Sequence, residues 1–255
     1  MSVMEEKDVM SGGSSIPFGR LLAVEARKLL DTRGSKIMIL ILVVLVIAAI
    51  VGRGFFSGPE FHRLVGTAGI GYGTLLPALG ILTVTSEWSQ RTALTTFTLE
   101  PRRWRVLAAK CVPPLVVAVV ASGFAVLVAA SATAVVAGVQ GVGADWEVEP
   151  SALLGWAGGN VLLMGVGLAL GMLFLNAPAA IVVFLSAPML ANIVHGLGSA
   201  GKELVEWIDL NTAAGVLASG ELSGGDAARL AVTAVLWIAV PMAIGVARVV
   251  RREVS

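Results

Sequence analysis

The chain has 255 residues, of which 56% are hydrophobic and 14% are charged, and its formal net charge is +1. A mean hydropathy of +0.88 lies far outside the range of soluble globular domains, and the near-neutral charge gives no reason to expect a nucleic-acid partner. The apolar residues gather in runs of about 20, the length that an α-helix needs to cross the hydrocarbon core, and the alternating pattern of a membrane β-barrel is absent. The composition therefore predicts an all-α polytopic membrane protein.

Residues 1–36 are predicted to form a cytoplasmic tail followed by an amphipathic helix. The tail is polar and rich in Ser and Gly, which is typical of mobile termini. Within residues 18–30 the apolar side chains recur at helical spacing, and Arg20, Arg27 and Lys28 lie elsewhere on the helical wheel. Such a helix either lies in the membrane interface with its cations toward anionic headgroups or serves only as a basic, positive-inside anchor. The residues leave both interpretations open.

Six apolar runs in residues 37–248 are long enough to be membrane spans. The predicted spans are 37–55, 64–85, 112–139, 153–175, 179–195 and 230–246. Gly34 and Ser35 mark the predicted break before the first span. Asn176 marks a short turn before the fifth span, and residues 249–255 form a basic cytoplasmic tail.

Glycines spaced four residues apart allow helices to pack closely in a membrane. Three such pairs occur within the predicted spans: Gly69 and Gly73, Gly155 and Gly159, and Gly167 and Gly171. We expect these positions to be helix-packing surfaces rather than ligand sites.

The basic residues predict the orientation of the spans. Most of the 18 Lys and Arg residues lie before span one, between spans two and three, or after span six. The positive-inside rule therefore places these segments, and both termini, in the cytoplasm. Residues 196–226, between spans five and six, then lie on the outer side. They are too polar to cross the membrane but carry many apolar side chains, which predicts short helices or a re-entrant hairpin.

No catalytic, nucleotide-binding or metal site is predicted on this chain. Gly196–Lys202 matches most of a phosphate-binding loop, but Glu203 stands where the Mg²⁺-binding Ser or Thr belongs, and the string follows a membrane span instead of a strand. His62 and His195 are the only histidines, both predicted on the outer side, and Cys111 is the only cysteine. A metal site built on histidines or cysteines is therefore not expected, and the chain is predicted to be a non-enzyme without a cofactor of its own.

The predicted spans lack ionisable groups near their centres. Proton relays and ion pathways usually employ such groups, so ion-coupled transport is disfavoured, and a transport step would draw its energy from another chain. Ser122 is a polar residue within the third span, and we expect it to hydrogen-bond within its own helix.

A polar and basic island, residues 87–110, separates spans two and three. Its first half, from Glu87 to Thr98, predicts a short helix with Trp88, Arg91 and Thr92 on one face. Proline cannot continue a helix interior, so Pro101 is expected to end this helix.

The second half of the island is basic. Arg102, Arg103 and Arg105 are expected to meet lipid headgroups, and Lys110 is expected to extend its ammonium group from the start of span three to the interface. A short helix fixed between two spans would transmit the motion of a docked partner, whereas an ordinary basic loop would only obey the positive-inside rule. The residues by themselves leave both interpretations open.

Across nearly the whole chain the sequence resembles the six-span permease subunits of type-2 ABC exporters. The resemblance rests on three stretches: Glu25 to Leu29, Glu87 with Arg91 and Thr92, and Pro101 to Arg103 leading to Ala109 and Lys110. The short turn near Asn176 and the semi-polar segment 196–226 match as well. The family often has Gly immediately before the Thr, where this chain has Arg91, and this departure affects how the helix begins or which ATPase it fits.

The resemblance implies a permease of the bacterial inner membrane that pairs with a second copy or a paralogue and with two separate ATPase subunits. ATP and Mg²⁺ would bind to the ATPase. The resemblance also implies an interfacial connecting helix, with the residues Arg20, Glu25, Arg27 and Lys28. It implies a coupling contact with the ATPase, assigned to Glu87, Trp88, Arg91, Thr92, Phe97, Arg102 and Arg103. The segment 196–226 would form re-entrant outer helices, and spans one, two and five would line the pathway.

Two other classes of function remain open. The chain is alternatively a membrane scaffold or sensor subunit that transports nothing, with the island as a docking surface, or a facilitator that works without ATP. The residues predict no particular substrate, although a largely uncharged pathway would suit an amphiphile, a lipid-linked molecule, a drug or a peptide.

Overall fold

The computed structural model describes residues 16–90, 98, 102–220 and 223–251. In these residues the structure is helical apart from loops, turns and one isolated bridge between Glu60 and Asp145. Six segments are helical, long and apolar enough to cross a membrane: 33–57, 61–89, 103–140, 150–174, 177–195 and 224–251. The predicted all-helical, multi-pass fold is confirmed at this level.

The long helices are α3 (Arg33–Ser57), α5 (Gly69–Ser89), α7 (Arg103–Gln140), α8 (Pro150–Phe174) and α9 (Ala177–His195). The short helix α4 (Phe61–Thr67) leads into α5. The last segment is built from α12 (Gly224–Ala234), the π-helical η1 (Val235–Ala239) and α13 (Val240–Arg251). Three further short helices are α2 (Phe18–Asp31), α10 (Ser199–Ile208) and α11 (Leu210–Ser219).

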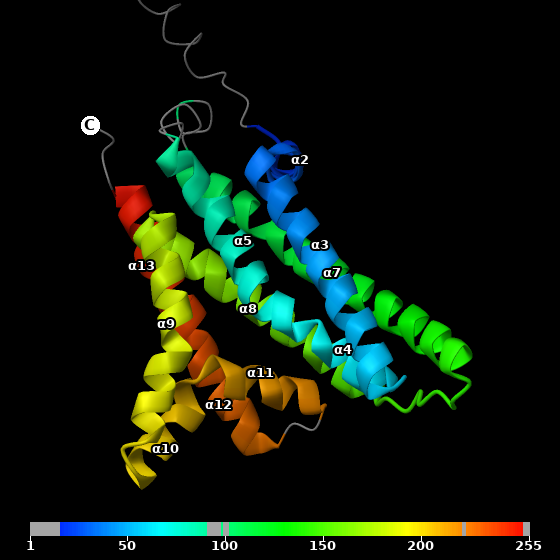
Figure 1. The fold of residues 1–255 in the computed structure, drawn as a ribbon. Helices are drawn as coiled ribbons and strands as arrows, with labels where there is room; N and C mark the ends of the chain where they lie inside the picture. Colours follow the sequence, from blue (N-terminus) through cyan, green and yellow to red (C-terminus); the bar gives the residue numbers. More distant parts are fainter. Residues whose placement is uncertain (1–15, 91–97, 99–101, 221–222, 252–255) are drawn as a thin grey trace, which may run out of the picture.

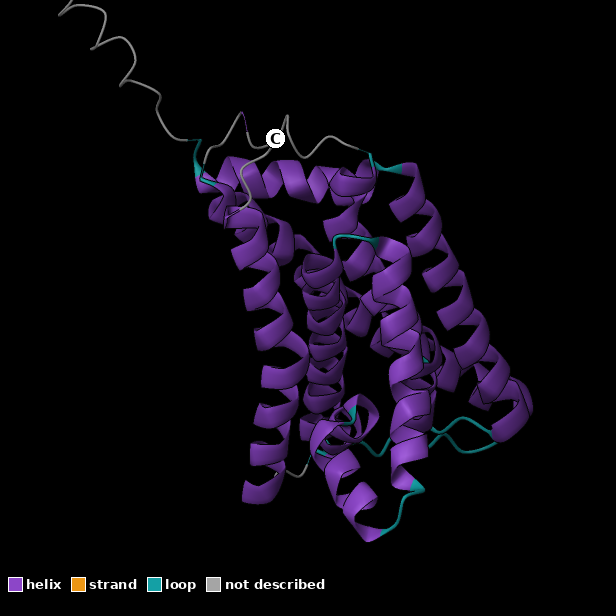
Figure 2. Cartoon of the chain, turned by 90° about the vertical axis from the view of Figure 1, so that its left-hand side faces the viewer, coloured by secondary structure: helices purple, strands orange, loops and turns teal. Residues whose placement is uncertain are grey.

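The bundle has two distinct ends (Figure 1). One end carries α2, the last turn of α5, the start of α7 and the end of α13, and we refer to it as the α2 end. The opposite end carries α4, α10, α11 and the start of α12, and we refer to it as the α10 end. Figure 2 shows α2 lying across its end of the bundle rather than along the long helices.

Helices α5 and α8 form the centre of the bundle. Both are buried over most of their length, whereas α3, α9 and the last segment expose most of theirs. Their close approach depends on glycine, because a Cβ at Gly171 would come within 3.2 Å of Ile81 and a Cβ at Gly167 would clash with the backbone of Pro77. The predicted packing role of this glycine pair is confirmed.

The other two glycine pairs behave differently from each other. Gly155 and Gly159 of α8 face α11, where a Cβ at Gly159 would lie 3.7 Å from Ala214, so this pair also serves close packing. Among the described residues Gly69 and Gly73 have no packed neighbour, since a Cβ at either position would meet nothing within 4 Å, and a packing role for this pair stays a prediction. Their side of α5 borders a cavity beside α9 instead of a packed neighbour.

Two predicted helix boundaries need correction. Thr32 is the N-cap of α3, its hydroxyl accepting a hydrogen bond from the amide of Ser35, so the break precedes Gly34 instead of falling on it. Helix α7 begins at Arg103, well before the predicted start of span three, and its 38 residues correspond to about 57 Å. The basic second half of the island therefore forms the first turns of α7.

The segment between α9 and the last span forms the two short helices α10 and α11. Short helices were one of the two structures predicted for this segment. Helix α11 packs against α8. The last span holds the segment through side chains: Thr233 donates to the carbonyl of Trp207 (3.0 Å), and Nε1 of Trp237 donates to the carbonyl of Ile208 (2.8 Å). The segment is thus fixed to the bundle at the α10 end.

Candidate functional site

Four charged side chains form a closed ring at the α2 end. Glu25 and Lys28 come from α2, Glu87 from the last turn of α5, and Lys110 from α7. The Nζ atom of Lys28 lies 2.8 Å from Glu25 Oε1 and 2.6 Å from Glu87 Oε1. The Nζ atom of Lys110 lies 2.8 Å from Glu25 Oε2 and 3.2 Å from Glu87 Oε1. Each carboxylate thus bridges both ammonium groups, and we refer to these four residues as the charge ring.

The charge ring is largely removed from solvent. Glu25, Glu87 and Lys110 are 5%, 8% and 3% exposed, and only the Lys28 side chain reaches 40% exposure. Taking an ion out of water costs several kcal/mol unless opposite charges and hydrogen bonds compensate it. Two cations and two anions in alternation satisfy this requirement, so each member depends on the other three.

The amphipathic pattern of α2 explains how the ring is assembled. Residues three apart lie on one face of a helix, which places Glu25 beside Lys28. Leu29, one turn after Glu25, is buried in the same core as Val106 and Leu107 at the start of α7. This apolar contact holds α2 across the bundle, and Arg105 adds a hydrogen bond to the carbonyl of Ile16, at 2.8 Å, just before α2 begins.

Lys28 is the ring member with most access to water. Burial by itself would lower the pKa of its ammonium group, but the hydrogen bonds and negative charges of Glu25 and Glu87 outweigh burial and raise the pKa above its ordinary value. Lys28 is therefore protonated at neutral pH and acts as a permanent cation in the ring.

The structure places only part of the predicted coupling contact. Glu87 and Trp88 lie in the last turn of α5, so they continue the second span rather than starting a separate helix. Trp88 packs partly buried against the core. Arg91, Thr92 and Phe97 lie outside the described residues.

The predicted basic residues divide into two groups. Arg20 and Arg27 are exposed on α2, and Arg102 is exposed just before α7. Arg103 donates to the carbonyl of Val249 (2.9 Å) and so ties the start of α7 to α13. Besides any headgroup contact, Arg103 and Arg105 therefore bond to backbone carbonyls of the protein itself.

Lys110 is a site residue that the sequence analysis missed. It was expected to extend toward the interface, and this expectation is wrong, because its side chain is buried and bonded to Glu25 and Glu87. The sequence did hold one indication that Glu25 needs a cationic partner. Glu25 is an acid close to the apolar face of a basic helix, and a buried acid requires a cation. What the sequence did not show is that α2 crosses α7 at this lysine.

A second set of polar contacts joins the helices deeper in the bundle. Ser122 of α7 bonds to the carbonyl of Ala118 as predicted, and it also accepts a hydrogen bond from Asn160 of α8 at 3.0 Å. The hydroxyl of Tyr72 on α5 donates to the carbonyl of Ala121 at 2.6 Å. Helices α5 and α7 are thus joined at the charge ring, and both are joined again, together with α8, within the bundle.

Taken together, the fold and the ring define an all-helical, multi-pass membrane protein with a buried ionic joint between a crosswise helix and two long helices. No protein-family model matches this chain, and no curated protein matches it.

Proposed function

We propose that the chain is the permease subunit of an ATP-driven exporter of the type-2 ABC kind, and that the charge ring couples a docked ATPase to the bundle. The observation that supports this proposal is the position of the ring relative to the residues assigned to ATPase contact, which run from Glu87 to Arg103. Glu87 is the first of these residues and Lys110 follows the last, and Lys28 and Glu25 of α2 bond to them.

The ring gives a physical route for coupling. A push by the ATPase on this contact displaces the end of α5 and the start of α7. The ion pairs then oblige α2 to follow, because separating them would leave buried charges without these partners. The hydrogen bond of Tyr72 makes α5 and α7 move together, and the hydrogen bond of Asn160 to Ser122 carries the displacement of α7 to α8. The two-state element in this scheme is the position of α5, α7 and α2 relative to the rest of the bundle.

The orientation of the chain is part of the same proposal. The α2 end carries exposed Arg20, Arg27 and Arg33, together with Arg248 and Arg251 from α13. By the positive-inside rule this end faces the cytoplasm, where ATP is available, and α10 and α11 lie on the outer side. Helix α2 then lies in the cytoplasmic interface, with its exposed arginines toward lipid headgroups.

A cavity of about 430 Å³ beside α5 is consistent with a pathway for an uncharged or amphiphilic substrate. Its walls are mostly apolar and come mainly from α5 and α9, with contributions from α8, α10, α11 and η1; they include Ile70, Phe184 and Trp237. The acidic wall residue Asp209 is already used, since its carboxylate accepts a hydrogen bond from the amide of Thr212 at 2.8 Å. Gly69 and Gly73 keep the α5 wall open because they carry no side chain.

The test begins with affinity purification of the full-length chain in mild detergent, followed by mass spectrometry and an ATPase assay. We expect a separate ATPase chain to co-purify, with an ATP turnover that depends on the permease. Glu87→Gln removes one charge of the ring and should reduce this dependence. Glu203→Gln is the matched control, because Glu203 is an exposed residue of α10 at the other end of the bundle.

The outcomes separate the candidate functions. Co-purification with turnover that falls only in the Glu87→Gln variant supports the exporter. If the ATPase co-purifies but both variants behave like the wild-type chain, the ring is not the coupling element. If the protein is recovered alone or with an unrelated partner, the exporter proposal fails, and a scaffold that uses the ring as a static clamp is the function to test next.

A further inference from the structure

A second cluster of charged side chains lies at the α10 end, where two loops meet. Glu60, just before α4, and Asp145, in the loop between α7 and α8, form a parallel bridge. The amide of Phe61 donates to the carbonyl of Asp145 at 2.9 Å, and the amide of Asp145 donates to the carbonyl of Pro59 at 3.0 Å. The ring of Phe61 lies 5.8 Å from that of Trp146. Backbone and aromatic contacts thus hold the two loops together.

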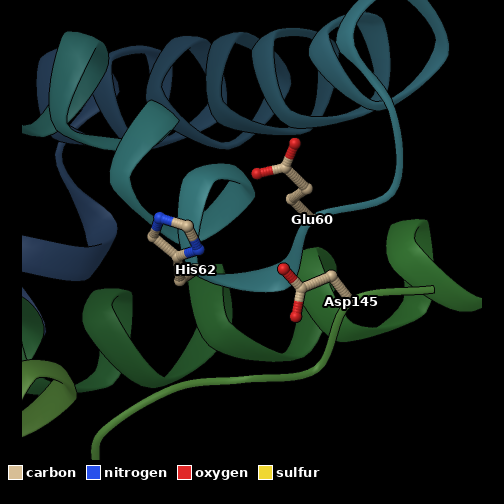
Figure 3. Close-up of side chains that lie close together, drawn as sticks. All are labelled: Glu60, His62 and Asp145. Carbon is tan, nitrogen blue, oxygen red and sulfur yellow. The ribbon is translucent and has the colours of Figure 1, made fainter.

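His62 completes the cluster from the first turn of α4. Glu60, His62 and Asp145 each offer one ligand atom, and these atoms lie within 4.8 Å of one another (Figure 3). His62 and Asp145 are exposed and Glu60 is half-buried, so a cation has access from solvent. We propose that these three residues, referred to as the distal triad, form a binding site for a divalent cation of the zinc class.

The ligand types decide the class of metal. An imidazole nitrogen with two carboxylate oxygens suits Zn²⁺ and neighbouring transition metals, whereas Ca²⁺ and Mg²⁺ prefer oxygen ligands alone. Zinc–ligand distances of about 2.0–2.2 Å require the three atoms to draw closer together than they are here. Two of the three side chains are exposed and can adjust. Three protein ligands leave at least one position for water.

Arg63 modulates this site. Its guanidinium holds Glu60 through two contacts, Nε to Oε2 at 2.8 Å and Nη1 to Oε1 at 3.0 Å. The ion pair keeps the Glu60 carboxylate near the triad but competes with an incoming cation for its oxygens. The carboxylate of Asp145 is less occupied, because Oδ1 accepts from the amide of Glu147 at 2.9 Å and Oδ2 is left for a metal. Removal of Arg63 should therefore strengthen metal binding.

The experiment measures Zn²⁺ binding by the purified full-length protein in detergent, prepared without a histidine tag. Isothermal titration should give one site per chain. Loss of a residue that only supports a metal ligand typically weakens metal binding by roughly 10- to 100-fold. The His62→Gln and Asp145→Asn variants each remove a ligand and should weaken Zn²⁺ binding by more than this. His195→Gln is the matched control, since His195 is the only other histidine of the chain and is exposed in the last turn of α9.

A second readout uses stability. A ligand that binds only the folded state raises the unfolding temperature, so Zn²⁺ should raise it for the wild-type chain and for His195→Gln but not for His62→Gln. Arg63→Gln should bind Zn²⁺ more tightly than the wild-type chain. The proposal is overturned if Zn²⁺ binding survives the loss of both His62 and Asp145, if His195→Gln weakens it as much as His62→Gln, or if the wild-type chain does not bind Zn²⁺. None of these measurements depends on the exporter assignment.

Discussion

The charge ring and the distal triad are two small clusters of charged groups at opposite ends of one bundle, and they differ mainly in burial. In the ring, three of the four residues are less than 10% exposed, and cations and anions alternate completely. In the distal triad, two of the three residues are exposed, and among the described residues Arg63 pairs with the carboxylate of Glu60 alone.

This difference shows what burial demands of a charged cluster. The buried charges of a cluster need partners of opposite sign within the protein, so such a cluster is a structural joint in which the loss of a buried member is costly. An exposed cluster keeps its water and can remain incompletely paired, and it is therefore able to accept a cation from solution. Each of the following predictions tests this contrast.

The largest effect is expected for Lys110→Met, which keeps the length of the side chain but removes its charge. Glu25 and Glu87 would then lose the buried cation that lies between them, and breaking a buried ion pair by removing one partner typically costs about 3–5 kcal/mol. Arg63→Met, at the exposed cluster, should cost about 0–1 kcal/mol. Thermal unfolding in detergent, followed by loss of helical circular dichroism, measures both. If Lys110→Met and Arg63→Met lost equal stability, burial would not distinguish the charge ring from the distal triad.

A smaller effect is expected for the coupling between ring members. Once Lys110 is replaced by Met, a Glu25→Gln change removes a carboxylate that has already lost a partner, so it should cost less than in the wild-type chain. Interaction energies of about 0.5–3 kcal/mol are usual for residues in one ionic network. The four proteins of this double-mutant cycle can be compared by the same unfolding measurement. Strict additivity would mean that Glu25 and Lys110 act independently, and the ring would then not be a single joint.

The sequence predicted the parts of this structure that depend on periodicity and length. The helical fold, the six long apolar segments, the glycine contacts at Gly167 and Gly171, and the internal hydrogen bond of Ser122 all follow from patterns within one helix. Glu25, Lys28 and Glu87 were singled out individually, from amphipathic spacing and from a family resemblance.

The features that the sequence could not predict depend on which helices become neighbours. The role of Lys110 arises because α2 crosses α7 beside it, and the distal triad exists only because the loop with Asp145 pairs with the residues before α4. Gly69 and Gly73 also show that spacing within a helix does not predict which helix lies beside it. Their spacing defines a face of α5, but no helix packs on that face within the described bundle.

The smallest effect is expected from the titration of Lys28, whose partial exposure weakens its contribution to stability. Its pKa in the folded protein is raised above the reference value of 10.5, because Glu25 and Glu87 outweigh the opposing effect of burial. A raised pKa means that the stabilisation is fully present below the unfolded-state pKa and is lost as pH rises through the folded-state pKa. The unfolding temperature of the wild-type chain should therefore decline as the pH rises above this reference value. The Lys28→Met variant should be less stable at neutral pH and should lack that part of the alkaline decline. If the unfolding temperatures of the wild-type chain and of Lys28→Met changed with pH in parallel, Lys28 would not stabilise the ring through its charge.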